Sequence, residues 1–153
     1  MKRSPEKKKL EEILRSSKLV AGGFLGSDNR DLDEIIACDA VQISRLGYTK
    51  EQIAGRMREI TAAGVARLGM AVVVEGKIEV KVDEWKGMIV CPWPHQGRYA
   101  KRITIARDVK SGRIIRWSDL NTHMIGQHGF FEGKGSLFRL EPGKLVEIIF
   151  CND

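Results

Sequence analysis

The chain has 153 residues, of which 42% are hydrophobic and 30% are charged. This length and balance are typical of one domain with a buried core, and they exclude a disordered chain and a mini-protein that depends on disulfides. The formal net charge is +6, so anionic partners are compatible with the sequence without being identified by it.

Residues 1–69 show the patterns of about three helices. Ser4 is followed by proline and can cap a first helix. Asp31 has a glutamate three residues later, as in a capping box, and opens a second helical pattern that stops at Gly47. Thr49 begins another capping box, and the apolar stripe of the third helix ends near Gly69.

After Gly69 the hydrophobic period changes from near four to two, which indicates strands. Apolar and charged residues alternate over 77–83, and residues 70–75 are the expected hairpin partner across Gly76. Pro142 and Gly143 have the order of a type II turn. Further strands are expected at residues 88–91, 102–107, 114–117, 137–140 and 145–150.

Helices followed by strands, without alternation of the two, predict an α+β fold. We expect about three N-terminal helices packed on an antiparallel sheet or open barrel of roughly six to seven strands. The domain prediction is one unit over residues 1–153, with a helical part over 1–69 and a β-rich part over 70–153.

All three histidines lie within 34 residues of one another, and a cysteine precedes the first of them. Thiolate and imidazole are the ligand types that zinc prefers, so a divalent metal such as zinc is one hypothesis. Cys91 and His95 could share one ion only if the proline-rich segment between them turns. His123 and His128 are five residues apart, off the helical i, i+4 register, so we expect a loop there. The metal-ligand set of this hypothesis is Cys91, His95, His123 and His128.

The same residues permit two other kinds of site. In a Cys-dependent or metal-assisted hydrolase, Cys91, His128 and Glu132 are the candidate catalytic groups. In a pocket for a small polar or anionic ligand, the glycine-rich loop over residues 126–136 forms one wall. That loop lacks the spacing of a phosphate-binding P-loop, and a loop whose glycines adopt positive φ while Phe130 and Phe131 plug the core is the more frequent case. The candidate ligand-binding residues are His95, Arg98, His123, His128, Glu132 and Lys134.

Charge along the chain favours an anionic ligand near the histidines, because residues 86–153 carry eleven basic and six acidic groups. RNA is the alternative partner. Basic and aromatic residues interleave over 98–117, as on a β surface that contacts phosphates and stacks on bases. No known RNA-binding signature is present, and a homo-oligomer is compatible with the sequence.

The sequence shows neither a secretory signal nor a membrane-spanning segment, and the expected compartment follows from this. The basic start of the chain lacks the apolar region of a secretory signal, and no stretch approaches the roughly 18 apolar residues that span a bilayer. Cys38, Cys91 and Cys151 are widely spaced, as expected of reduced thiols. We therefore expect a cytoplasmic protein without a membrane segment.

Overall fold

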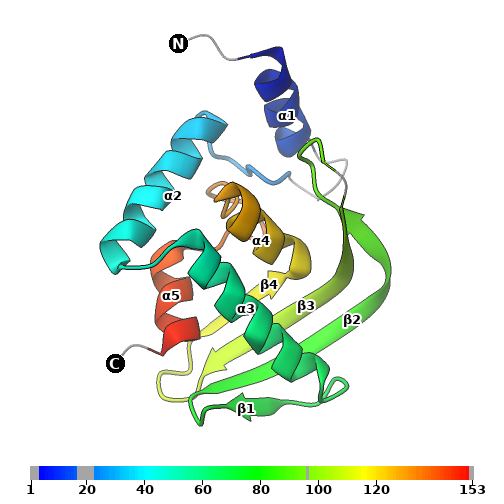
Figure 1. Cartoon of the computed structure of the whole chain (residues 1–153), viewed down its shortest axis with the longest axis vertical. Coiled ribbons are helices and arrows are strands. Elements are labelled where there is room, and N and C mark those ends of the chain that lie inside the picture. The colour runs from blue at the N-terminus through cyan, green and yellow to red at the C-terminus, as the bar shows by residue number, and fades with distance from the viewer. Residues whose placement is uncertain (1–3, 17–22, 96, 152–153) are drawn as a thin grey trace.

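The fold is an antiparallel sheet with helices on one face (Figure 1). It is a computed structural model that describes residues 4–16, 23–95 and 97–151. The strands follow one another in the order β1-β2-β3-β4 and all neighbours are antiparallel. Their bounds are β1 Val72–Val74, β2 Ile78–Val90, β3 Arg98–Asp108 and β4 Ile114–Ser118.

Three helices precede the sheet, as the sequence predicts. Ser4 accepts a hydrogen bond from the Lys7 backbone N–H, and Thr49 and Gln52 form the predicted capping box. Asp31 stands at the start of the second helix but its side chain does not cap it. The bounds are α1 Pro5–Arg15, α2 Leu32–Leu46 and α3 Lys50–Val65.

The C-terminal half contains more helix and fewer strands than the sequence predicts. Asp119–His123 forms α4, Met124–His128 forms the π-helix η1, and Pro142–Phe150 forms α5. The strand prediction for residues 145–150 is therefore wrong, and residues 137–140 form turns and irregular chain. The sheet has four strands among the described residues, not six or seven, because residues 88–91 belong mostly to the end of the long β2.

Burial explains the helix α5, whose side chains favour strands by composition. Its residues Leu145, Ile148 and Ile149 are buried at helical spacing, and Pro142 occupies the first turn, where no hydrogen bond is lost. A helix that is buried on most of its sides and a short buried strand both have a continuous run of apolar residues in the sequence. Which of the two forms depends on the elements that the segment packs against.

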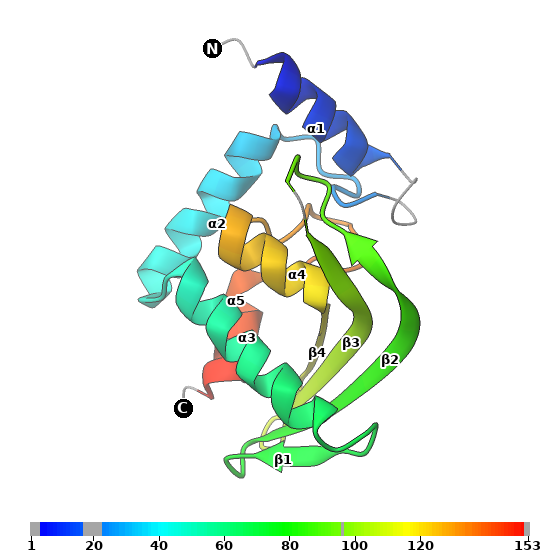
Figure 2. The same cartoon turned by 45° about the vertical axis from the view of Figure 1, so that its right-hand side comes forward.

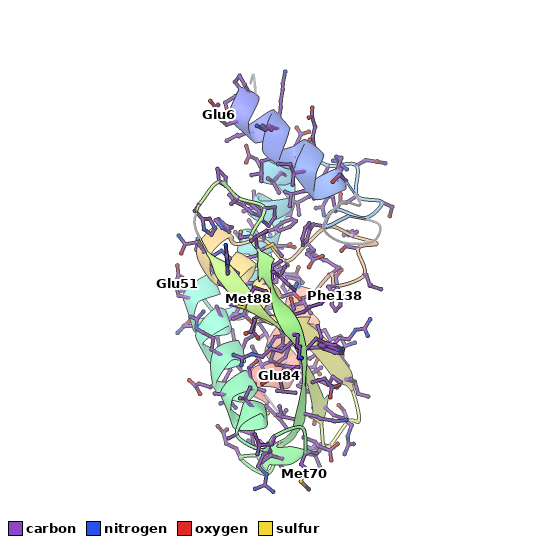
Figure 3. All side chains as sticks on the ribbon, turned by 90° about the vertical axis from the view of Figure 1, so that its right-hand side faces the viewer. Glu6, Glu51, Met70, Glu84, Met88 and Phe138 are labelled. Atoms are coloured by element: carbon purple, nitrogen blue, oxygen red, sulfur yellow. The ribbon has the colours of Figure 1, made fainter. Side chains whose placement is uncertain are left out.

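The main core lies between the sheet and helices α3 and α5 (Figure 2). The predicted alternation is confirmed, since Ile78, Val80 and Val82 face this core and are at most 2% exposed. Gly64 of α3 lies against Val80 and Val82, where an added Cβ would be 2.4 Å from a methyl group of Val82. The opposite face of the sheet carries no helix of the described chain, and Figure 3 labels Glu84 and Met88 on β2.

A second apolar cluster lies at the other end of the molecule. It joins α1, the loop before α2, and α4 with η1; its buried members are Leu10, Leu14, Phe24, Leu25, Leu32, Ile35, Cys91, Leu120, Met124 and Phe130. Cys91 belongs to this cluster, so apolar packing fixes the position of its side chain. No helix in the described part of the chain is long and apolar enough to cross a membrane.

Candidate metal centre

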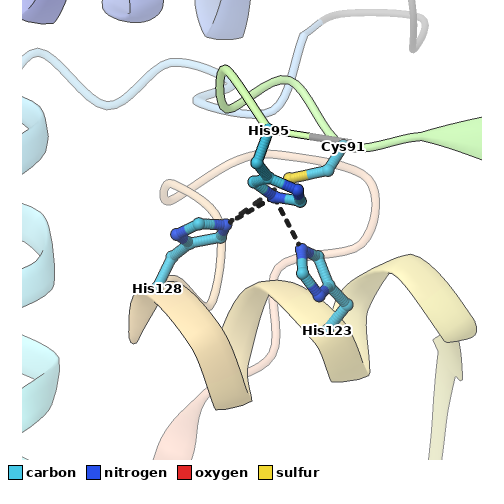
Figure 4. A group of neighbouring side chains, drawn as sticks. All are labelled: Cys91, His95, His123 and His128. Atoms are coloured by element: carbon cyan, nitrogen blue, oxygen red, sulfur yellow. Dashed lines mark hydrogen bonds between the residues drawn. The ribbon is translucent and has the colours of Figure 1, made fainter. Parts of the chain in front are cut away.

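The structure brings Cys91 and all three histidines together (Figure 4). Cys91 directly follows β2, and His95 lies in the loop that leads to β3. His123 ends α4 and His128 ends η1. One ligand atom from each of the four residues lies within 4.8 Å of the ligand atoms of the other three. The four residues are therefore close enough to bind a single metal ion.

A π-helical turn aligns the two histidines that are five residues apart. Residues 124–128 form the π-helix η1 directly after α4, without an intervening loop. The π-helix has i→i+5 hydrogen bonds, so positions five residues apart follow one another around a turn of this kind. The expectation of a loop between His123 and His128 was therefore wrong. The turn ends at Gly129, whose φ of 66° is in the left-handed region.

The proline-rich segment turns, as the metal hypothesis required. Residues 92–95 are bends, and the His95 backbone N–H donates to the Trp93 carbonyl at 2.8 Å. Trp93 stacks on the ring of His128, with centroids 4.1 Å apart and planes within 7°. This stacking holds the loop over η1, so that Cys91 and His95 face His123 and His128.

Three of the six separations between the four ligand atoms are close to those of tetrahedral zinc coordination. The Nε2 atom of His95 is 3.2 Å from Nε2 of His128 and 3.1 Å from Nε2 of His123. Sγ of Cys91 is 3.6 Å from Nε2 of His128. A tetrahedron with zinc bond lengths has nitrogen–nitrogen edges of about 3.3 Å and nitrogen–sulfur edges of about 3.5 Å. These three separations agree with the tetrahedral edges within a few tenths of an ångström, and the other pairs of ligand atoms lie within 4.8 Å of each other.

Burial and neighbouring charge set the protonation of the cluster. The pKa of His128 is lowered to about 4, first by burial and then by the other two histidines and Lys50. Burial also lowers the pKa of His123 and raises the pKa of the Cys91 thiol. The lowered pKa values favour the neutral, metal-binding form of His123 and His128, whereas the Cys91 thiol must lose its proton to bind. Metal binding therefore releases a proton from Cys91.

Tyr99 contacts the ring nitrogen of His123 that does not face the other three candidate ligands. Its hydroxyl is 2.8 Å from Nδ1 of His123, the ring nitrogen that points away from the other ligands. Partners of this kind fix the tautomer and the ring orientation of a metal-binding histidine. Tyr99 is on β3 and pairs with Ile89 near the end of β2. The sheet therefore positions both the loop ligands and the support for His123.

Glu132 lies apart from this cluster. It is 2% exposed and its carboxylate accepts hydrogen bonds from Asn121 at 2.6 Å and Ser136 at 2.5 Å. It lines a different hollow of about 590 Å³, largely apolar and bordered by Trp85 and Phe138. Burial raises its pKa to about 7, against the effect of its two hydrogen-bond donors. The structure therefore does not place Glu132 among the candidate metal ligands.

The glycine-rich loop packs against the backbone of residues 24–28. Gly133 donates its N–H to the Phe24 carbonyl at 2.9 Å, and a Cβ at Gly133 would be 2.3 Å from the Leu25 carbonyl oxygen. Phe130 and Phe131 are at most 1% exposed, so they plug the core. The Lys134 side chain is exposed, and its backbone N–H donates to Asp28. Close approach of two backbones explains these glycines without an anion.

The remaining sequence candidates lie on β3 and β4. Arg98 is exposed and pairs with Val90 in the sheet. Trp117, which we expected on an RNA-binding surface, is fully buried and donates to Thr61 at 3.0 Å. It cannot stack on a base. RNA binding by the other basic residues, ligand binding by Arg98 and Lys134, and a homo-oligomer stay predictions.

A hollow of about 490 Å³ adjoins the cluster at His123, and sequence reasoning missed most of its lining. Its walls are α3, β3 and the turn that carries the histidines; the lining residues are Glu51, Arg58, Thr61, Ala62, Tyr99, Arg102, Asp119, Thr122, His123, Gly126 and Gln127. Arg58 belongs to the exposed face of α3 and has no local signal in the sequence. Only the packing of α3 on η1 brings it near His123.

Comparison with protein-family models, with curated proteins and with solved structures gives no match for this chain. The site geometry is therefore the basis for a functional proposal.

Proposed function

We propose that the protein is a metal-binding protein that holds one zinc ion through Cys91, His95, His123 and His128. The observation that carries the proposal is the convergence of Sγ of Cys91 with the Nε2 atoms of His95, His123 and His128. One thiol and three imidazoles whose ligand atoms lie within 4.8 Å of one another provide the four ligands that a zinc ion takes.

The ligand types favour zinc over the hard cations. Magnesium and calcium prefer oxygen ligands, whereas one thiolate and three imidazoles suit zinc. A bound ion would join the β2–β3 loop to the end of η1 and thereby stabilise a segment that contains two prolines and has little regular structure of its own. This argument supports a structural role for the ion.

The hydrolase alternative makes a different demand on the ion. Catalytic zinc sites have three protein ligands and keep one position open for water. Cys91, His95, His123 and His128 fill all four positions, so hydrolysis would require one of them to dissociate. The closed arrangement therefore favours a structural ion over metal-assisted hydrolysis.

Metal analysis of the full chain, expressed without a metal-affinity tag, tests the proposal. We expect about one zinc per chain in the wild type. His128→Ala and Cys91→Ser should each lower the zinc content at least tenfold after dialysis against a weak chelator. Cys38→Ser is the matched control, because Cys38 is an exposed free cysteine outside the cluster. A zinc content below about 0.1 per chain, or equal contents in the wild type and His128→Ala, would refute the proposal.

Cobalt substitution tests the ligand set independently of zinc content. Tetrahedral cobalt(II) with one thiolate ligand has strong visible absorption and a sulfur-to-cobalt charge-transfer band. We expect both in the wild type and in Cys38→Ser. Cys91→Ser should lose the charge-transfer band. Its persistence in that variant would show that Cys91 is not a ligand.

A further inference from the structure

The hollow beside His123 has the size and the polar groups of a small-ligand site. Its volume of about 490 Å³ is within the usual range for such sites. Arg58, Arg102, Glu51 and Asp119 are the charged side chains that line it, together with the hydroxyl-bearing Tyr99.

Arg102 and Asp119 largely neutralise each other. Nε of Arg102 donates to the Asp119 carboxylate at 2.7 Å, and Glu84 lies 3.8 Å from another nitrogen of the same guanidinium. Arg58, in contrast, has no carboxylate partner among the described residues. Glu51, the other acidic lining residue, is seven positions earlier on α3, about 10 Å away along the helix axis. Arg58 is therefore the cation that the hollow leaves available.

The Arg58 guanidinium lies near the candidate metal centre. A Cβ added to Gly126 would lie 3.9 Å from a terminal nitrogen of Arg58, so the side chain crosses the turn between His123 and His128. A guanidinium without a carboxylate partner in the protein can donate two parallel N–H hydrogen bonds to the oxygens of a carboxylate or phosphate group.

Metal binding would add a second donor. With Nε2 of His123 on the metal, Nδ1 carries the proton and donates it to the Tyr99 oxygen 2.8 Å away. The hydroxyl of Tyr99 then has its own proton free for another acceptor. Tyr99 lines the hollow, so this acceptor can be a ligand there. A zinc ion with one thiolate and three neutral imidazoles also adds one net positive charge beside it.

We propose that this hollow binds a small anion, a carboxylate or phosphate group, through the Arg58 guanidinium and the Tyr99 hydroxyl, and that zinc binding strengthens it. This inference rests on the proposed zinc site, because the ion selects the His123 tautomer that turns Tyr99 into a donor. The coupling is reciprocal, so a bound anion increases zinc affinity by the same factor.

Isothermal titration calorimetry on the full zinc-loaded chain tests the inference, with inorganic phosphate and succinate as separate probes and no free zinc. We expect at least one probe to bind with a dissociation constant below about 1 mM. Arg58→Gln and Tyr99→Phe should each weaken its binding about tenfold, the usual scale for one charge-assisted hydrogen bond. Removing zinc should weaken it at least about fivefold. Which probe binds distinguishes phosphate from carboxylate.

Arg67→Gln and Tyr48→Phe are the matched controls. Arg67 is an exposed arginine just after α3, and Tyr48 stacks on Phe150; neither lines the hollow. Both should bind the anion like the wild type. The inference is overturned by no binding up to 10 mM, by equal binding with and without zinc, or by target variants that behave like their controls. Zinc content is measured on the same samples. A chain without zinc contradicts the proposed function, whereas full zinc content without anion binding contradicts this inference alone.

Discussion

Replacement of Glu132 by glutamine should change how the stability of the protein depends on pH. Glu132 is 2% exposed, and burial raises its pKa from 4.5 to about 7. In the unfolded chain the carboxyl is solvated and titrates near 4.5. The folded state therefore binds this proton more tightly than the unfolded state. Stability from this group is fully present below pH 4.5, and it is lost as the pH rises through about 7.

The magnitude follows from the two pKa values. A change from 4.5 to about 7 corresponds to about 3 kcal/mol of unfolding free energy, at about 1.4 kcal/mol per pKa unit. Glutamine has nearly the same shape and can still accept a hydrogen bond from Asn121, but it does not ionise. Relative to the wild type, the variant should therefore gain about 3 kcal/mol between pH 4.5 and pH 8.

Urea unfolding of the zinc-free chain at several pH values measures this difference. Zinc is removed so that proton competition at the metal ligands does not contribute. Glu59→Gln is the matched control, because the Glu59 side chain is 70% exposed. It should differ from the wild type by no more than about 0.5 kcal/mol at any pH, the scale of the exposed ion pair between Glu59 and Arg56. The reasoning fails if the difference between Glu132→Gln and the wild type is constant across this range, since burial would then not be changing the protonation of Glu132.

Two further predictions concern packing and a buried ion pair. Gly64→Ala should destabilise the fold by about 1–3 kcal/mol in spite of better helix propensity, because its methyl group would overlap Val82. Gly55→Ala, on the same helix with open space around it, should instead stabilise by up to about 1 kcal/mol in the same urea assay. Arg139→Met should cost about 3–5 kcal/mol, because it leaves the 3% exposed Asp39 unpaired. Adding Asp39→Asn should recover part of that loss, and thermal melts of the single and double variants check it.

The site was partly predictable. Clustering of three histidines and one cysteine within a short stretch of sequence made a shared ion one hypothesis among several, and the structure brings these residues together. Their spacing was misleading for His123 and His128, because a π-helical turn has no distinct local pattern in the sequence. Glu132 is only four residues after His128, yet its carboxylate faces Asn121 and Ser136.

The sequence by itself determined the three N-terminal helices, the hairpin around Gly76, the buried face of β2 and the set of residues able to bind a metal. These features depend on local periodicity, capping and ligand chemistry. Only the tertiary structure decided that residues 145–150 form a helix, that Trp117 is buried, and that Arg58 and Tyr99 flank His123. These features depend on contacts between residues far apart in the chain, and on which apolar side chains find a partner to pack against.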